Sequence, residues 1–333
     1  MRIAVIGAGA VGGTIAALMA AGGHSVSLVA RGPQLEALRL RGLTLTGAFG
    51  SAAASITPVP GLLETPELAF VCTKAQDART AIDAQAEHLS GIPVVIVQNG
   101  IEGLAAASGM LPDSEVLGGL AVFAASYLEP GMVTATASGP TFLGSGSGPA
   151  SATALRVAGM INEVMPCTAV ANFTGAQWTK LIVNQVNSLP AITGLSAQEC
   201  IRDLGLGLIL TAGMREAVRT GLASGIRFGS IMGLNHMTLR LFAASPLALG
   251  RILPLGMAKQ MGPVPNPGST LQSIRRNQRT EIDFLNGAVV NAATALGRRA
   301  PINATLTALV HQVETEGRFL SPAAVENAVN LAR

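Results

Sequence analysis

Short apolar runs alternate with helical patterns along the first part of the chain. Uninterrupted apolar runs predict buried strands at residues 2–6, 24–29, 68–72 and 93–97, and a helical pattern at residues 11–21 follows the first of them. Strands without polar alternation are typical of a parallel sheet that helices cover on both faces. The pattern therefore predicts an α/β fold, in which a doubly wound parallel sheet forms the first domain.

Strand-like patterns continue further along the chain and help to place the end of this domain. They cover residues 118–127, 132–137 and 141–143. The Gly/Ser/Pro stretch at 144–149 has the composition of a linker, but a helix at 150–164 and a strand at 167–171 then continue the same sheet. We therefore expect a first domain of residues 1–172 and a second of residues 173–333.

In the remainder of the chain, apolar residues recur at intervals of three and four, which predicts an all-α second domain. The expected helices cover residues 176–189, 204–223, 273–295 and 304–316. Between them, residues 228–267 are rich in Met, Gly and Pro, and they predict a short helix with a loop.

Composition narrows the class of protein. A chain of 333 residues is long enough for two domains, and 49% hydrophobic residues with a mean hydropathy of +0.46 exclude a largely disordered chain. Lys and Arg number 22 against 19 Asp and Glu, a formal net charge of +3. So small an excess leaves no electrostatic footprint for nucleic acid, and we expect no nucleic-acid partner.

The cysteines and the uncharged N-terminal run indicate the cellular compartment in which we expect the protein. Cys72, Cys167 and Cys200 are scattered and lack metal-ligand spacing, so we expect free thiols in a reducing compartment, with no disulfide framework and no metal site. Residues 3–30 carry no charge and resemble an export signal or a membrane span, but repeated glycines interrupt the run. We expect a cytoplasmic protein that does not cross a membrane.

The strongest motif lies between the first strand and the first helix. Gly7, Gly9 and Gly12 form a Gly-x-Gly-x-x-Gly pattern in that context, which is typical of a Rossmann dinucleotide site. Successive glycines permit the tight turn, the approach of a pyrophosphate and close helix packing. The alternative is a glycine turn with a purely structural role. The candidate cofactor-binding residues of this loop are Gly7, Ala8, Gly9, Ala10, Val11 and Gly12.

Arg31 ends the second predicted strand, at the position that distinguishes the two nicotinamide cofactors. Sites that prefer NAD place an acid there, which accepts hydrogen bonds from the ribose hydroxyls. A guanidinium instead fits a 2′-phosphate bidentately, so Arg31 favours NADP. The alternative is a surface arginine at the end of a strand.

Two further loops carry polar side chains where strands end. Lys74 follows the strand at 68–72, and Asn99 follows the strand at 93–97. Because the carboxyl ends of parallel strands line one crevice, Lys74 is placed to approach a cofactor phosphate or ribose, and Asn99 to hydrogen-bond nicotinamide or substrate. The alternative is that both are ordinary polar loop residues.

A polar stripe follows one face of the predicted helix at 176–189. Lys180, Asn184 and Asn187 lie at spacings i, i+4 and i+7. Reduction of a ketone forms an alkoxide that needs a nearby proton or cation, and a partly buried lysine with a lowered pKa could supply either. A solvated helix face would give the same pattern. Glu281, taken alone, has the features of a surface acid in a salt bridge.

Together, these segments resemble the ketopantoate reductase family over nearly the whole chain. The matching residues are the loop from Gly7 to Gly12, Arg31, Thr73 and Lys74, Gln98 to Gly100, Lys180 with Asn184, and Ser269 with residues 280–283. The resemblance implies an N-terminal NADP-binding Rossmann domain and a helical C-terminal domain, with the active site in the cleft between them. It also implies a homodimer that forms through the helical domain.

The resemblance also implies roles for individual residues. Lys180 would be the general acid that protonates the reduced carbonyl, and Glu281 a second catalytic or cleft-organising residue. Three residues would hold the nicotinamide or the carboxylate and hydroxyl of a 2-oxo acid substrate: Asn99, Asn184 and Ser269. Ala125 would touch the cofactor through its backbone.

Two features depart from the family pattern. The family commonly has a second asparagine eight residues after the lysine, where this chain has Ser188, with Asn187 one position earlier. Either the helix carries a shift, or Ser188 takes a different substrate contact. Residues 228–268 are longer and richer in Met and Pro than the family pattern, so they could reshape the pocket.

The expected activity is NADPH-dependent reduction of 2-dehydropantoate to (R)-pantoate, a step in pantothenate and coenzyme A synthesis. One alternative is a reductase of the same fold for another 2-oxo or β-hydroxy acid. Another is a non-catalytic NADP-sensing protein, which the presence of both Lys180 and Glu281 disfavours.

Overall fold

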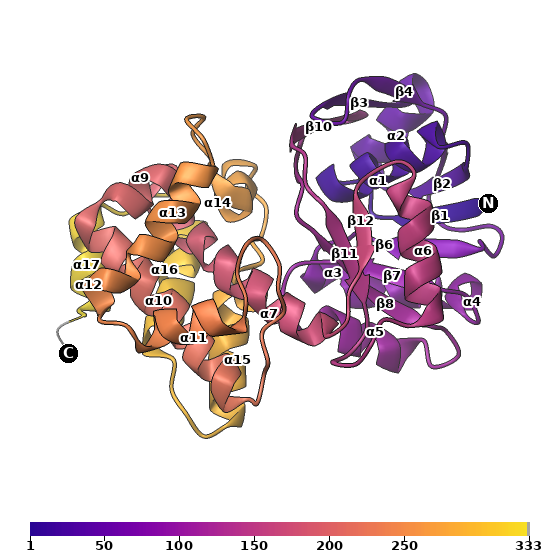
Figure 1. Cartoon of the computed structure of the whole chain (residues 1–333). Helices are drawn as coiled ribbons and strands as arrows, with labels where there is room; N and C mark the ends of the chain where they lie inside the picture. Colours follow the sequence, from indigo (N-terminus) through magenta and orange to yellow (C-terminus); the bar gives the residue numbers. More distant parts are fainter. Residues whose placement is uncertain (332–333) are drawn as a thin grey trace. The chain divides into compact units, whose positions relative to one another are not determined.

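The computed structural model describes residues 1–331, apart from the side chain of residue 128 (Figure 1). The chain divides into two units, Met1–Phe173 and Thr174–Arg333. None of the helices in the described part of the chain combines the length and apolar character that a membrane crossing requires.

An eight-stranded sheet forms the centre of the N-terminal unit. In order across the sheet, the strands are β12 (Cys167–Ala169), β11 (Thr141–Gly144), β8 (Val116–Ala121), β7 (Val94–Val97), β6 (Leu68–Val71), β1 (Arg2–Ile6), β2 (Ser25–Val29) and β5 (Thr57–Val59). Strand β11 runs antiparallel to β8, and the other neighbouring pairs are parallel. From β1 the chain builds outward on both sides, which confirms the predicted doubly wound sheet and makes the carboxyl end of β1 a topological switch point.

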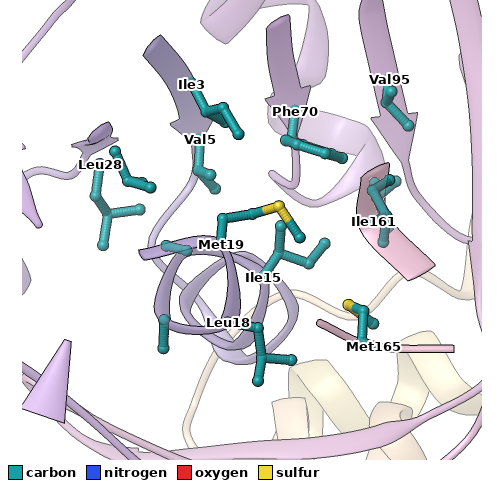
Figure 2. Close-up of a cluster of buried hydrophobic side chains, with 14 of the residues drawn as sticks. Ile3, Val5, Ile15, Leu18, Met19, Leu28, Phe70, Val95, Ile161 and Met165 are labelled. Atoms are coloured by element: carbon teal, nitrogen blue, oxygen red, sulfur yellow. The ribbon is translucent and has the colours of Figure 1, made fainter. Parts of the chain in front are cut away.

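Helices bury both faces of this sheet. They are α1 (Ala10–Ala21), α2 (Gly32–Arg41), α3 (Ala75–Asp83), α4 (Ala86–Leu89), α5 (Gly103–Met110) and α6 (Ala152–Asn162). In β1, Ile3 and Val5 belong to one core and Ala4 and Ile6 to another, and all four are at most 2% exposed. Figure 2 shows Ile3 and Val5 on the side of Met19 in α1. Burial on alternate faces explains why the strand pattern is continuously apolar.

A second sheet in the same unit was not predicted. Its order is β4 (Ala52–Ala54), β3 (Leu43–Gly47), β10 (Met132–Ala137) and β9 (Ala124–Glu129). The prediction of one strand at 118–127 is wrong, because β8 ends at Ala121 and β9 joins the second sheet. Residues 132–137 also belong to the second sheet, in which they form β10. This sheet packs on α1, where a Cβ at Gly13 would lie 2.7 Å from Cγ1 of Val133.

The regular elements among the described residues of the C-terminal unit are helices, as predicted, apart from an isolated bridge between Ile231 and Leu234. Its α-helices are α7 (Phe173–Asn184, whose first residue belongs to the N-terminal unit), α8 (Ser188–Thr193), α9 (Ala197–Arg202), α10 (Leu204–Ala223), α11 (His236–Ala244), α12 (Leu247–Gly250), α13 (Ile252–Gln260), α14 (Gly268–Arg275), α15 (Asn286–Ala295), α16 (Pro301–Glu316) and α17 (Pro322–Val329). Helix α10 is the longest and packs against α9, α11, α16 and α17.

Two predicted helices are interrupted. Instead of one helix over 176–189, α7 ends at Asn184 and a 3-10 turn, η1 (Gln185–Asn187), precedes α8. Pro190 lacks the N–H for a continuous ladder but fits the first turn of a new helix. The helix expected at 273–295 is divided between α14, the 3-10 turn η2 (Ile282–Phe284) and α15. Residues 228–267 hold three helices, α11 to α13, rather than one.

Candidate active site

Two glycines of the motif between β1 and α1, Gly7 and Gly12, have no room for a side chain. Gly7 has φ +104°, and a Cβ there would lie 2.8 Å from the backbone nitrogen of Thr73. A Cβ at Gly12 would overlap the carbonyl oxygen of Gly7 and lie 2.9 Å from Cβ of Cys72. The loop therefore packs directly against the segment that follows β6, and Gly12 lets α1 lie close to the end of β1.

Gly9 has the opposite surroundings. A Cβ at Gly9 would have no atom within 4 Å, so the backbone here borders open space. Gly9 is also the N-cap of α1, where no side chain caps the helix and the first turn carries no acid. Uncapped amide groups and the positive end of the helix dipole favour an anion, and this geometry fits the pyrophosphate of a dinucleotide.

The side chain of Gln34 forms hydrogen bonds that fix the glycine loop, a role that the sequence did not predict. Its Nε2 donates to the carbonyl of Ala8 at 2.9 Å. Its Oε1 accepts from the Tyr127 hydroxyl at 3.1 Å and from the backbone nitrogen of Gly131 at 2.9 Å. One amide in the first turn of α2 thus connects the glycine loop to the second sheet.

Arg31 lies at the carboxyl end of β2, as the N-cap residue of α2. Its side chain is 86% exposed, and Nη2 lies 3.8 Å from Oδ1 of Asp77, whose side chain is 47% exposed. Exposed pairs at this distance contribute little free energy, so the guanidinium keeps its capacity to bind a phosphate.

Lys74 and Asn99 follow neighbouring strands, β6 and β7, and both are half-buried. Between them, Nε2 of Gln98 donates to the carbonyl of Thr73 at 3.0 Å. Three buried polar atoms at this sheet edge have no hydrogen-bond partner: Oγ1 of Thr73, Oε1 of Gln76 and Oε1 of Gln98. Unpartnered buried polar atoms are costly, and a polar ligand in the crevice could satisfy them.

Ala125 belongs to the second sheet rather than to the main one. It is half-buried on β9 and pairs with Ala135 of β10, and both strands pack against α1. Its backbone therefore lies on the layer that covers the helix of the glycine loop.

Lys180 is half-buried on α7, within a helix whose neighbouring residues are buried. Burial lowers the pKa of Lys180 to about 8, and the negative charge of Glu281 opposes part of this shift. An ammonium group with this pKa is mostly charged at neutral pH and gives up its proton more readily than an ordinary lysine. The charges of Lys180 and Glu281 therefore interact within the C-terminal unit.

Glu281 lies on a turn between α14 and η2, not on a helix as its surroundings in the sequence suggest. The turn is fixed by α16: the backbone nitrogen of Thr280 donates to Oε1 of Glu314 at 2.7 Å. His311 lies between two carboxylates, with Nδ1 2.6 Å from Oε2 of Glu314 and Nε2 2.9 Å from Oδ1 of Asp283. These contacts hold the backbone on both sides of Glu281.

Ser188 and Asn187 are consecutive in the chain, but their side chains have different surroundings. Ser188 is fully buried and its Oγ donates to the carbonyl of Gln185 at 3.0 Å, which argues against the substrate contact expected for it. Asn187 is half-buried on η1, and a Cβ at Gly268 would lie 2.5 Å from its Oδ1. Helix α7 ends at Asn184, and Ser188 begins α8 among that helix's buried residues.

Ser269 is exposed at the start of α14, and Asn184 is half-buried at the end of α7. Asn187 lies against Gly268, so it is adjacent to Ser269 along the neighbouring chain segment. Among the described residues, no group of three or more His, Cys, Asp or Glu side chains is placed to hold a metal ion. The candidate site residues of this unit offer an ammonium at Lys180, a carboxylate at Glu281, amides at Asn184 and Asn187, and a hydroxyl at Ser269.

The family models match most of the chain. A model described as Ketopantoate reductase PanE/ApbA covers residues 3–148, and one described as Ketopantoate reductase PanE/ApbA C terminal covers residues 172–314. The chain belongs to the ketopantoate reductase family. The resemblance inferred from the sequence is confirmed, and with it the assignment of the chain as an oxidoreductase.

Curated relatives cover the ketopantoate reductase chain almost completely. It is 30% identical to the 2-dehydropantoate 2-reductase of Pyrococcus horikoshii over 324 residues, which is 95% of this chain and 99% of that one. Identity to the enzyme of the same name from Archaeoglobus fulgidus is 29% over 320 residues, or 94% of this chain and 98% of the relative.

Solved structures share the ketopantoate reductase fold. A PanE/ApbA family ketopantoate reductase from Ralstonia eutropha has a TM-score of 0.81 at 27% identity, covering 95% of this chain and 99% of that one. A D-mandelate dehydrogenase, solved with NADH and anilino(oxo)acetate, also has a TM-score of 0.81 at 20% identity, covering 99% of this chain and 100% of that one. The latter likeness concerns the fold alone.

Proposed function

We propose that this chain reduces 2-dehydropantoate to (R)-pantoate with NADPH, in the synthesis of pantothenate and coenzyme A. The observation that carries the proposal is Lys180, half-buried, with a pKa of about 8 and electrostatically coupled to Glu281. Relatives that align along almost the entire chain are named 2-dehydropantoate 2-reductase, which supports this choice of substrate.

The N-terminal unit would hold the cofactor. The amide groups at Gly9 would bind the pyrophosphate, Arg31 the 2′-phosphate, and Lys74 the adjacent phosphate or ribose. Asn99 and the backbone of Ala125 would contact the nicotinamide half. The cofactor supplies the hydride that reduces the ketone carbon.

The C-terminal unit would hold the substrate and move the proton. Asn184, Asn187 and Ser269 would donate to the carboxylate and hydroxyl of the 2-oxo acid, and the Lys180 ammonium would lie at its ketone oxygen. As negative charge develops on that oxygen, Lys180 transfers a proton to it. The carboxylate of Glu281 favours the charged form of Lys180, so that Lys180 carries its proton at neutral pH.

A substrate panel tests the proposal directly. The purified chain is assayed with 2-dehydropantoate, other branched 2-oxo acids and aryl 2-oxo acids, each with NADPH and with NADH. We expect the highest kcat/KM for 2-dehydropantoate with NADPH. Cofactor binding without turnover of any 2-oxo acid would overturn the assignment and favour a cofactor-sensing protein.

A reductase of another 2-oxo acid is the second candidate. Helices α11 to α13 occupy the 228–268 segment that leads into Ser269, where added helices can change the shape of a substrate pocket. A higher kcat/KM for an aryl or longer branched 2-oxo acid than for 2-dehydropantoate would establish this alternative. The homodimer and the cytoplasmic location stay predictions.

A further inference from the structure

Helix α10 carries a pocket that shares no residue with the candidate active site. The pocket has a volume of about 410 Å³ and lies in the C-terminal unit. Its charged lining residues are Arg215, Glu216, Arg219, Arg298 and Arg299. Four arginines around one concave surface are unusual in a chain with so few charged residues, and nothing in the reductase chemistry uses them.

The sequence places these side chains together by helical periodicity. Ala212, Arg215 and Arg219 are spaced i, i+3 and i+7 along α10, so they share one face of the helix. Arg298 and Arg299 come from the loop that joins α15 to α16, and Leu247 at the start of α12 lines the pocket with them. With Leu331, which follows α17, four separate segments build one site.

The two arginines of α10 are held close together without a carboxylate. Nη2 of Arg215 and Nη2 of Arg219 donate to the same acceptor, the carbonyl of Ala243, at 3.2 and 3.0 Å. The Nε of Arg215 is buried and has no hydrogen-bond partner. Like charges at such a position repel each other, and an unpartnered buried donor is costly unless an acceptor arrives.

The one acid in the lining, Glu216, offsets only part of this positive charge, and its carboxylate oxygens are engaged by another helix. Oε1 of Glu216 accepts from the backbone nitrogen of Ile302 at 3.2 Å, and Oε2 accepts from the backbone nitrogen and Nδ2 of Asn303 at 2.8 and 2.7 Å. Glu216 therefore caps the start of α16. Within residues 1–331, none of the four arginines has a carboxylate oxygen within 4.0 Å.

We propose that this pocket binds a small ligand that carries a diphosphate group. Four positive charges and one negative charge leave a formal charge of +3 on the lining, which complements the roughly three negative charges of a diphosphate at neutral pH. Guanidinium groups match phosphate oxygens bidentately, and the volume is in the range of small-ligand sites. Ala212, Leu247 and Leu331 provide an apolar wall for an organic portion.

Titration calorimetry tests the proposal on the full chain, independently of the reaction. The glycine loop is first saturated with NADPH or NADH, whichever binds more tightly, so that it cannot take the probe. Sodium pyrophosphate, ADP and inorganic phosphate are then titrated separately. We expect one saturable site for pyrophosphate, with inorganic phosphate at least about tenfold weaker because it makes half the contacts.

The double variant Arg298→Gln/Arg299→Gln removes two exposed arginines without disturbing the core, and we expect it to weaken pyrophosphate binding about 10- to 100-fold. Arg318→Gln, which removes an exposed arginine elsewhere in the same unit, is the matched control and leaves binding unchanged. Arg219→Gln tests the α10 side of the pocket and should weaken binding by about tenfold.

The probes also distinguish the source of the diphosphate. ADP binding that is tighter than pyrophosphate binding, and is lost in the double variant, supports an organic diphosphate. Equal affinities support recognition of the phosphates alone. Absence of saturable pyrophosphate binding at millimolar concentration, or binding that survives the double variant, overturns the proposal.

Discussion

Gly9 and Gly12 lie three residues apart, yet a methyl group would meet opposite surroundings at the two positions. At Gly12 it would overlap the carbonyl of Gly7, whereas at Gly9 it would enter open space. The packing of the fold therefore requires glycine at Gly12, whereas at Gly9 it is the proposed approach of a ligand that requires it.

Alanine at each position separates these two requirements. Gly12→Ala should destabilise the N-terminal unit by about 1–3 kcal/mol, because packed backbone must move. Gly9→Ala should change stability by less than about 1 kcal/mol but weaken cofactor binding by about tenfold or more, because the methyl occupies the space of the pyrophosphate. Thermal unfolding and cofactor titration measure both effects. Equal destabilisation by the two variants would contradict this division of roles.

Arg31 offers a second test at the scale of one residue. Arg31→Ala should weaken NADPH binding by about 1.5–3 kcal/mol and leave NADH almost unchanged, because only NADPH presents a 2′-phosphate to the guanidinium. Fluorescence titration of both cofactors checks this. Arg39→Ala, an exposed arginine on the same helix that follows β2, is the matched control. Equal losses for NADPH and NADH would show that Arg31 does not recognise the phosphate.

At the scale of elements, the turn that carries Glu281 depends on α16. Glu314 holds the backbone of Thr280, and His311 bridges Glu314 to Asp283. Burial disfavours the charge of His311, but hydrogen bonds and the charges of Asp283 and Glu314 outweigh it and raise its pKa. Such a group stabilises the fold fully below the unfolded-state pKa, and this contribution is lost as pH rises through the raised folded-state pKa.

His311→Gln removes this charged bridge. It should lower the free energy of unfolding by about 0.5–1 kcal/mol near pH 6, a modest value because the side chain is 44% exposed and solvent screens the pairs. The difference from wild type should shrink by about pH 9. Urea unfolding at both pH values measures it, with His88→Gln as the control. A difference that does not depend on pH would rule out the ion pairs as the cause.

At the scale of the whole molecule, local sequence patterns predicted most of the fold. The part that they missed depends on pairing between distant segments of the chain. Strands β1, β2, β6 and β7, and helix α10, follow from apolar runs and helical spacing. The second sheet escaped prediction because its strands are short, rich in Ala, Thr and Gly, and paired across long sequence separations, such as Thr44 with Met132. No local pattern encodes such a register.

The candidate site was predictable to a similar depth. Residue types and spacing indicated Lys180, and the family resemblance indicated Glu281, but not the turn that carries it. Helical spacing selected Asn187, which is half-buried, whereas the family pattern selected Ser188, which the start of α8 buries. Gln34 was missed because a polar residue in the first turn of a helix is ordinary until its partners are known.

In the proposed mechanism Lys180 is the proton donor, and burial and Glu281 together set its pKa. This assignment is tested by the pH dependence of kcat/KM for reduction of the best panel substrate, in wild type and in Glu281→Gln, with the exposed Glu316→Gln as control. In wild type, reduction should decline as pH rises through about 8, because the acid loses its proton. In Glu281→Gln the decline should move to lower pH, because the charge that raises the pKa of Lys180 is gone, while Glu316→Gln should match wild type. A midpoint that is the same in all three proteins would contradict the claim.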